Sequence, residues 1–236
     1  MKKICLPALI ACMAAAFSVR AGDISGTVTL KGTPPPEREI TPLKDDPNCG
    51  KLHSTVPKTQ FYVVSPNGGL KDVVILLKGA AGKGTADTKP VMLDQKGCEY
   101  TPYVMAVQAG EPIVVKNSDP VLHNVHALPM VPGNNEKNQA QPAGGPDLTF
   151  TFDKPENFLK FQCDVHNWMF AYVTVADSPF FAVTDKDGKY TIKNVPDGKY
   201  QLVAMHRKAA PASAPITKDV EVKGGNLTED FTITLK

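Results

Sequence analysis

Short runs of Val, Ile, Thr and aromatic residues recur along the chain between clusters of Gly, Pro, Asn and Asp, and apolar residues are rarely placed at helical spacing. This pattern predicts β-strands separated by turns, and therefore an all-β fold of sandwiches or barrels. The predicted strands are 24–30, 59–64, 72–78, 103–108, 112–117, 123–127, 148–152, 158–162, 171–175, 181–184, 189–192, 198–205, 217–222 and 229–235. Segments 32–57, 79–90 and 129–147 are predicted to be loops.

The first 21 residues have the pattern of an export signal. Lys2 and Lys3 precede an apolar run that ends at Phe17, and a small residue, Ala21, closes the segment. The segment predicts a Sec-type signal peptide over residues 1–21 and a periplasmic or secreted mature chain. An alternative reading is a lipoprotein anchored at Cys12. No later apolar run is long enough to predict a transmembrane segment in the mature chain.

Charge and cysteine content narrow the functional classes. Three of the 26 basic residues lie in the predicted signal, so the mature chain is close to neutral against its 24 acidic residues. This balance argues against nucleic acid as a partner. Cys49, Cys98 and Cys163 remain in the mature chain. If Cys163 binds a metal, Cys49 and Cys98 are the candidates for a disulfide in an oxidising compartment.

The C-terminal part has a strongly patterned hairpin sequence. Residues 184–200 place two Asp-Gly turns, at Asp187 and Asp197, on either side of an alternating strand. This segment resembles the carboxypeptidase-regulatory-like, transthyretin-like family of small Ig-like β-sandwiches. Residues 26–28 and 73–77 resemble the first two strand motifs of that family. The resemblance implies a sandwich split into residues 22–89 and 177–236, with a second domain, residues 90–176, inserted in it or fused to it.

The central part contains a candidate metal loop, in which Cys163, His166 and Met169 form a C-x2-H-x2-M pattern. Copper sites of the blue type combine two imidazoles and one thiolate with a weak axial thioether. A second histidine is therefore needed, and His123 is the best candidate because it follows a predicted strand. His126 lies three residues further and is expected on the opposite face of the strand. The remaining histidines, His53 and His206, are predicted to be at the solvated surface.

The combination of Asn117, His123-Asn124-Val125 and the C-x2-H-x2-M loop resembles the cupredoxins, and in particular plastocyanin- and amicyanin-like blue copper proteins. The resemblance implies an eight-stranded Greek-key sandwich with one mononuclear type 1 copper held by His123, Cys163, His166 and Met169. It also implies that the backbone N–H of Asn124 donates to the Cys163 sulfur. The chain departs from the family pattern at Asn167 and Ala171, where Pro and Gly are usual.

These observations predict an electron carrier and not an enzyme, because four protein ligands leave copper no open position and no acid–base or nucleophile pattern is visible. A redox protein is the implied partner, with His166 on an exposed loop as the electron port. Trp168 and Phe170 are candidate docking residues, although a position in the core is the simpler reading. Two alternatives remain: a copper storage or delivery protein that uses the segment 121–130, and a binding or structural module in which copper only stabilises the fold.

Overall fold

The computed structural model describes residues 21–80, 90–211 and 213–235. The predicted signal peptide, apart from Ala21, the alternative anchor at Cys12 and most of the predicted loop 79–90 lie outside these residues. Nearly all regular structure is β, as the sequence pattern predicts. Within the described residues, no helix is both long and apolar enough to cross a membrane.

Strands from the two ends of the chain share one pair of sheets, which we call the terminal sandwich. Its strands are β1 (Ala21–Lys31), β2 (Val73–Lys78), β12 (Phe181–Val183), β13 (Lys189–Pro196), β14 (Gly198–His206), β15 (Ile216–Val222), β16 (Leu227–Thr228) and β17 (Phe231–Thr234). One sheet has β1 between β13 and the short strands β16 and β17, and the other has the order β12-β2-β14-β15. Their facing sides enclose a hydrophobic core of their own.

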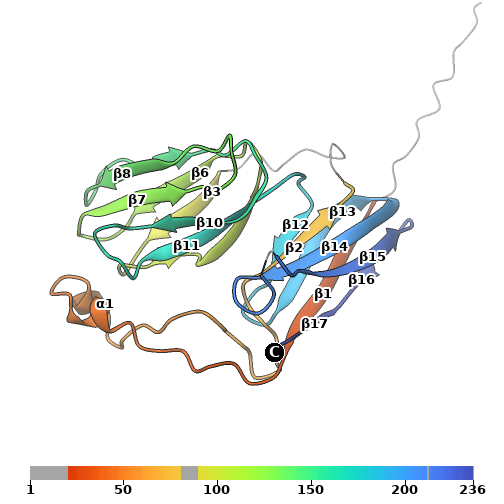
Figure 1. Cartoon of the computed structure of the whole chain (residues 1–236), viewed down its shortest axis with the longest axis horizontal. Coiled ribbons are helices and arrows are strands. Elements are labelled where there is room, and N and C mark those ends of the chain that lie inside the picture. The colour runs from red at the N-terminus through yellow and green to blue at the C-terminus, as the bar shows by residue number, and fades with distance from the viewer. Residues whose placement is uncertain (1–20, 81–89, 212, 236) are drawn as a thin grey trace, which may run out of the picture.

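The strands between these parts of the chain form the central sandwich. They are β3 (Val91–Gln95), β4 (Tyr100–Thr101), β5 (Val104–Gln108), β6 (Ile113–Asn117), β7 (His123–Leu128), β8 (Lys137–Gln141), β9 (Leu148–Phe150), β10 (Glu156–Gln162) and β11 (Phe170–Ala176). The sheets have the orders β5-β11-β10-β7-β8 and β4-β3-β6-β9. The two sandwiches lie next to each other (Figure 1). The strand pairing has the arrangement expected for an insertion, and the exact domain boundaries stay a prediction.

Several parts of the sequence prediction were wrong in detail. Residues 59–64 form no strand and contain one isolated bridge, from Val64 to Leu70; a second bridge, from Lys58 to Glu39, lies just before them. The bridge partners are outside strands, so no ladder can extend. Conversely, β8 lies inside the predicted loop 129–147. Its sequence, Lys137-Asn-Gln-Ala-Gln141, has no apolar alternation, since this edge strand is stabilised mainly by its ladder with β7. The strand β3 and the two-residue strands β4 and β16 were also missed.

The predicted loop 32–57 contains two short helices and extends away from the terminal sandwich. It includes α1 (Thr41–Asp45) and the 3₁₀ helix η1 (Gly50–Leu52). In Figure 1 it runs from β1 to α1, beside the central sandwich, before returning towards β2. Leu43 and Cys49 are fully buried in the core of the central sandwich. Residues 40–53 therefore form a cap on the central sandwich, although the sequence assigns them to the terminal one.

Candidate metal centre

The strand arrangement brings three distant side chains to one edge of the central sandwich. His123 is the first residue of β7, Cys163 follows β10 directly, and His166 lies in the loop that leads to β11. Because β7 and β10 are antiparallel neighbours, the start of one meets the end of the other. The ligand loop is closed by two backbone bonds, from Cys163 N to Met169 O at 3.1 Å and from Met169 N to His166 O at 2.9 Å.

The three side chains converge through their nitrogen and sulfur atoms. His123 Nδ1 lies 3.0 Å from His166 Nδ1, and Cys163 Sγ lies 3.6 Å from His166 Nδ1 and 4.0 Å from His123 Nδ1. With metal–nitrogen bonds of about 2 Å and metal–sulfur bonds of about 2.3 Å, a trigonal site separates its ligand atoms by about 3–4 Å. All three residues are buried, with exposures of 0% for His123, 1% for Cys163 and 7% for His166. The donor set and its spacing thus fit one soft-to-borderline metal ion such as copper.

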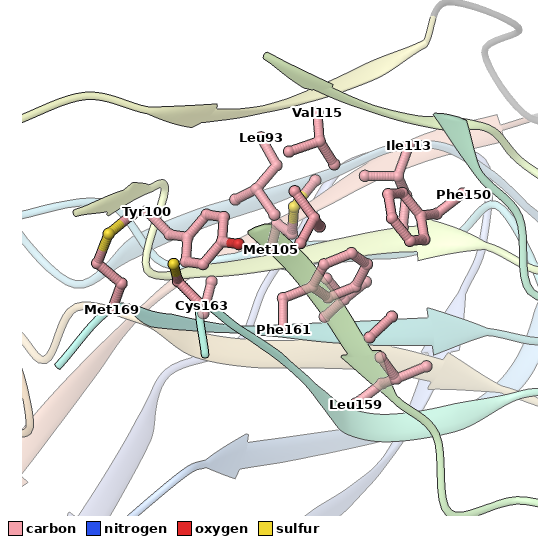
Figure 2. Close-up of a cluster of buried hydrophobic side chains, with 14 of the residues drawn as sticks. Leu93, Tyr100, Met105, Ile113, Val115, Phe150, Leu159, Phe161, Cys163 and Met169 are labelled. Atoms are coloured by element: carbon pink, nitrogen blue, oxygen red, sulfur yellow. The ribbon is translucent and has the colours of Figure 1, made fainter. Parts of the chain in front are cut away.

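Met169, the predicted axial ligand, is 1% exposed and belongs to the same core as Cys163. Figure 2 shows both residues at one end of the buried cluster, beside the ring of Tyr100. The position of Met169 in the ligand loop suits a thioether ligand, and the assignment of Met169 as a ligand stays a prediction.

Asn124 joins the two loops that carry the ligands. Its backbone N–H donates to Cys163 Sγ at 3.5 Å, the bond that the cupredoxin resemblance implies. Its side-chain oxygen also accepts the backbone N–H groups of Asp164 at 2.6 Å and Val165 at 3.3 Å. The residue after His123 therefore holds the start of the ligand loop in place and directs one donor at the thiolate.

Asp119 orients His123 and was not identified as a site residue from the sequence. Its carboxylate lies 2.9 Å from His123 Nε2, so the other ring nitrogen, Nδ1, faces the metal position. The same carboxylate accepts the backbone N–H groups of Gly97 at 2.6 Å and Cys98 at 2.7 Å. Asn117 supports this turn by accepting the Asp119 N–H at 3.0 Å. An acidic residue four positions before a candidate ligand histidine is the signal that could have revealed it.

The electrostatic surroundings favour a thiolate at Cys163. Burial opposes ionisation, but hydrogen bonds from His123 and from the backbone N–H groups of Asn124, His166 and Val165 outweigh it, so the pKa of Cys163 is lowered. Burial also lowers the pKa of His166, and the neighbouring His123 acts in the same direction. A deprotonated sulfur and a neutral imidazole are the forms that bind metal.

The disulfide prediction is confirmed, since Cys49 and Cys98 are bonded. This bond attaches the cap to the central sandwich beside the metal centre. The sulfur atoms of both cysteines lie within 4.8 Å of a ring nitrogen of His166, so the cap lies against this histidine. The loop that carries His166 is exposed at Asp164, Val165 and Asn167, whereas His166 itself is buried, with an exposure of 7%. Its role as the electron port stays a prediction.

Trp168 and Phe170, the candidate docking residues, are half-buried. The Trp168 ring lies 5.1 Å from the His166 ring, and its Nε1–H donates to Cys98 O at 3.1 Å. Phe170 packs against Tyr103 at 5.9 Å. Both line a cavity of about 310 Å³ between the metal loop and residues 38–61. Their role in docking stays a prediction.

The other histidines lie outside this cluster. His126 points away from it and bonds Asp164 and Glu136, both at 2.8 Å, on the outer face of the sheet. His53 is half-buried, with Nε2 2.6 Å from Gly97 O. The prediction of a solvated His206 was wrong: it is 3% exposed in the terminal sandwich and stacks on Tyr62 at 5.8 Å. It was mispredicted because an isolated histidine in a strand carries no burial signal.

Two buried imidazoles and a thiolate at the edge of a β-sandwich define the class of site as a candidate mononuclear metal centre. No family model and no curated protein matches the chain. Solved structures with a similar fold include a copper-containing nitrite reductase from Thermus scotoductus SA-01, which is 21% identical over 41% of this chain and 24% of that chain, with a TM-score of 0.33. A point mutant of amicyanin in its Cu(I) form is 20% identical over 43% of this chain and 97% of that chain, also with a TM-score of 0.33.

A purple cupredoxin from Nitrosopumilus maritimus is 18% identical over 36% of this chain and 98% of that chain, with a TM-score of 0.31. The structural neighbours are thus cupredoxins, and they are similar to less than half of this chain. At these scores the likeness assigns neither a family nor a function to the chain.

Proposed function

We propose that the chain is a mononuclear type 1 copper protein that carries single electrons between redox partners. The observation that carries this proposal is the buried convergence of His123 Nδ1, His166 Nδ1 and Cys163 Sγ within 4.0 Å of one another. Bound copper would supply the chemistry by alternating between two valences, one favouring nitrogen ligands and the other sulfur.

The residues around the ligands keep the site rigid. Asp119 holds His123, Asn124 holds the start of the ligand loop, and Cys49 of the cap lies against His166. A site whose geometry is held by the protein needs little rearrangement when the charge of the ion changes, which suits electron exchange. Among the three converging side chains, His166 has the largest exposure, and it remains the proposed electron port.

The proposed setting is the periplasm or the outside of the cell. The Cys49–Cys98 bond supports an oxidising compartment, and the first 21 residues have the pattern of an export signal. The proposed partner is a redox protein. We propose no enzymatic activity, because with Met169 as the fourth ligand the ion would have no open position.

Visible spectroscopy of the copper(II)-loaded protein tests the proposal. We expect a strong thiolate-to-copper absorption band that is lost in Cys163→Ser and kept in His126→Ala. The second variant is a matched control, because His126 lies in the same strand as His123 and faces the other side of the sheet. A colourless protein that transfers Cu(I) readily to a chelator would instead support copper storage or delivery. The deep burial of the three residues argues against such ready exchange.

A further inference from the structure

The Cys49–Cys98 disulfide lies directly against the two imidazoles of the metal centre. Both of its sulfur atoms and a ring nitrogen of His166 lie within 4.8 Å of one another. The Cys98 sulfur also lies within 4.8 Å of a carboxylate oxygen of Asp119 and a ring nitrogen of His123. We propose that reduction of this disulfide creates a second soft-metal site, in which the thiolates of Cys49 and Cys98 and the imidazole of His166 bind monovalent copper.

The chemistry of sulfur explains why the site would depend on reduction. A disulfide sulfur carries no charge and is a poor ligand, whereas a thiolate is the form of cysteine that binds metals. A water-soluble phosphine can supply the two electrons: the S–S bond breaks, each sulfur takes a proton, and the phosphine becomes its oxide with oxygen from water. Each thiol then releases its proton when it binds the ion.

The fold holds both cysteines in place without the covalent bond. Cys49 N donates to Asp46 Oδ1 at 2.8 Å, and Leu43 anchors the same cap in the central core. Cys98 N donates to Asp119 Oδ2 at 2.7 Å, and Cys98 O accepts the indole N–H of Trp168 at 3.1 Å. Both cysteines are fully buried. After reduction the two thiols therefore remain next to each other and next to His166.

The ligand set favours monovalent copper over other metals. Thiolates are soft ligands that select Cu(I), whereas zinc in closed structural sites requires four ligands. Two sulfurs and one nitrogen supply three, in a region from which water is excluded. This site does not use the Cys163 thiolate, but it shares His166 with the first centre, so that each of the two ring nitrogens of this imidazole would bind one ion. It goes beyond electron transfer because it would let the redox state of the cap set how many copper ions the chain binds.

The test measures Cu(I) binding under anaerobic conditions by competition with a coloured Cu(I) chelator, before and after treatment with the phosphine and its removal by desalting. We expect the oxidised chain to bind one equivalent and the reduced chain two. The double variant Cys49→Ser/Cys98→Ser should bind one equivalent under both conditions. An equal stoichiometry for oxidised and fully reduced wild-type protein, with free thiols verified by mass spectrometry, would overturn the proposal.

A second variant separates this proposal from the proposed function. In Cys163→Ser the electron-transfer centre loses its thiolate, but the reduction-dependent equivalent should persist. If reduction adds no copper to this variant, Cys49 and Cys98 only compete for the ion of the first centre, and the second site is refuted. Because the oxidised and reduced forms of one polypeptide are compared, the result does not depend on whether the double variant folds.

Discussion

At the scale of single residues, the candidate metal centre contains side chains that contact the predicted ligands as well as those ligands themselves. Asp119 accepts two backbone N–H groups of the turn between β3 and β4, and Asn124 accepts two backbone N–H groups of the ligand loop. Groups that bond to the far side of a ligand histidine set which of its nitrogens faces the metal. The sequence predicts His123, Cys163 and His166 as ligands, whereas Asp119 is recognised only from its contact with His123 in the structure.

The first prediction concerns Asp119. Replacing it by Ala removes the hydrogen bond to His123 Nε2 and leaves two backbone N–H groups without an acceptor. We expect copper affinity to fall by about 10- to 100-fold, as measured by competition with a chelator. Asp147→Ala, which removes an exposed carboxylate elsewhere in the same sandwich, should leave the affinity unchanged. Equal affinities for the two variants would contradict the role of Asp119.

The second prediction concerns pH and His206. Burial lowers the pKa of His206 to about 4, and its Nδ1 accepts the backbone N–H groups of Lys208 at 3.3 Å and Ala209 at 3.0 Å. The unfolded chain takes up this proton near pH 6.5. The neutral ring thus contributes stability above about pH 6.5, and this contribution is lost as the pH falls towards 4, by about 3 kcal/mol in total.

Denaturant unfolding of the metal-free protein at pH 7 and pH 4 measures this loss. The decrease in the free energy of unfolding should be smaller in His206→Gln, which cannot titrate, than in the wild type. His53→Gln, at the half-buried histidine of the cap, should retain the wild-type decrease. An identical decrease in wild type and His206→Gln would show that other groups cause the acid sensitivity.

At the scale of elements, the sequence pattern does not predict the helices of the cap or its packing on the central sandwich. Its helices α1 and η1 span five and three residues, too few to show an amphipathic repeat. The cap docks instead through Leu43 and the Cys49–Cys98 bond. The segments that lead into and out of the cap are hydrogen-bonded to each other. Thr59 N donates to Arg38 O at 2.8 Å, and Ile40 N donates to Pro57 O at 2.9 Å.

The third prediction tests the cap through Leu43. Leu43→Ala removes a fully buried side chain and should lower the free energy of unfolding by about 2–5 kcal/mol. It should also speed the transfer of copper to a chelator, because the cap lies against His166 through Cys49. Leu52→Ala is the control in the same segment, because Leu52 is 39% exposed and its replacement should change stability by less than about 0.5 kcal/mol. An unchanged transfer rate in Leu43→Ala would mean that the cap does not limit access.

At the scale of the whole molecule, a separate hydrophobic cluster joins the two sandwiches. It contains alternate residues of β2 and β14 from one side and residues of β5 and β11 from the other, including Leu76, Met205, Val104 and Tyr172. The opposite faces of β2 and β14 belong to the core of the terminal sandwich. This explains the continuous apolar run of β2, since both of its faces are buried. It also gives β11, which begins next to Met169, a direct contact with the other sandwich.

The fourth prediction follows from this contact. A bound ion stabilises the folded state that binds it, so copper should slow hydrogen exchange in β14 as well as in β10. In Met205→Asp, which places a charge in the joining cluster, the protection by copper should be confined to the central sandwich. Leu202→Ala is the control, because Leu202 lies in the same strand and faces the terminal core. Copper protection that never reaches β14 in the wild type would refute the coupling.

The sequence by itself determined the all-β class, most of the strands and the loop in which Cys163, His166 and Met169 are spaced. These are local properties, because alternation of side chains and ligand spacing follow from neighbouring residues. It also suggested Cys49 and Cys98 as a pair by elimination.

Only the tertiary structure decided that the cap packs on the central sandwich, that Asp119 orients His123 and that the disulfide lies against both imidazoles. These contacts join residues that are distant in sequence, or depend on which face of a turn a side chain occupies. These contacts result from sheet pairing and burial, and a local sequence pattern encodes neither.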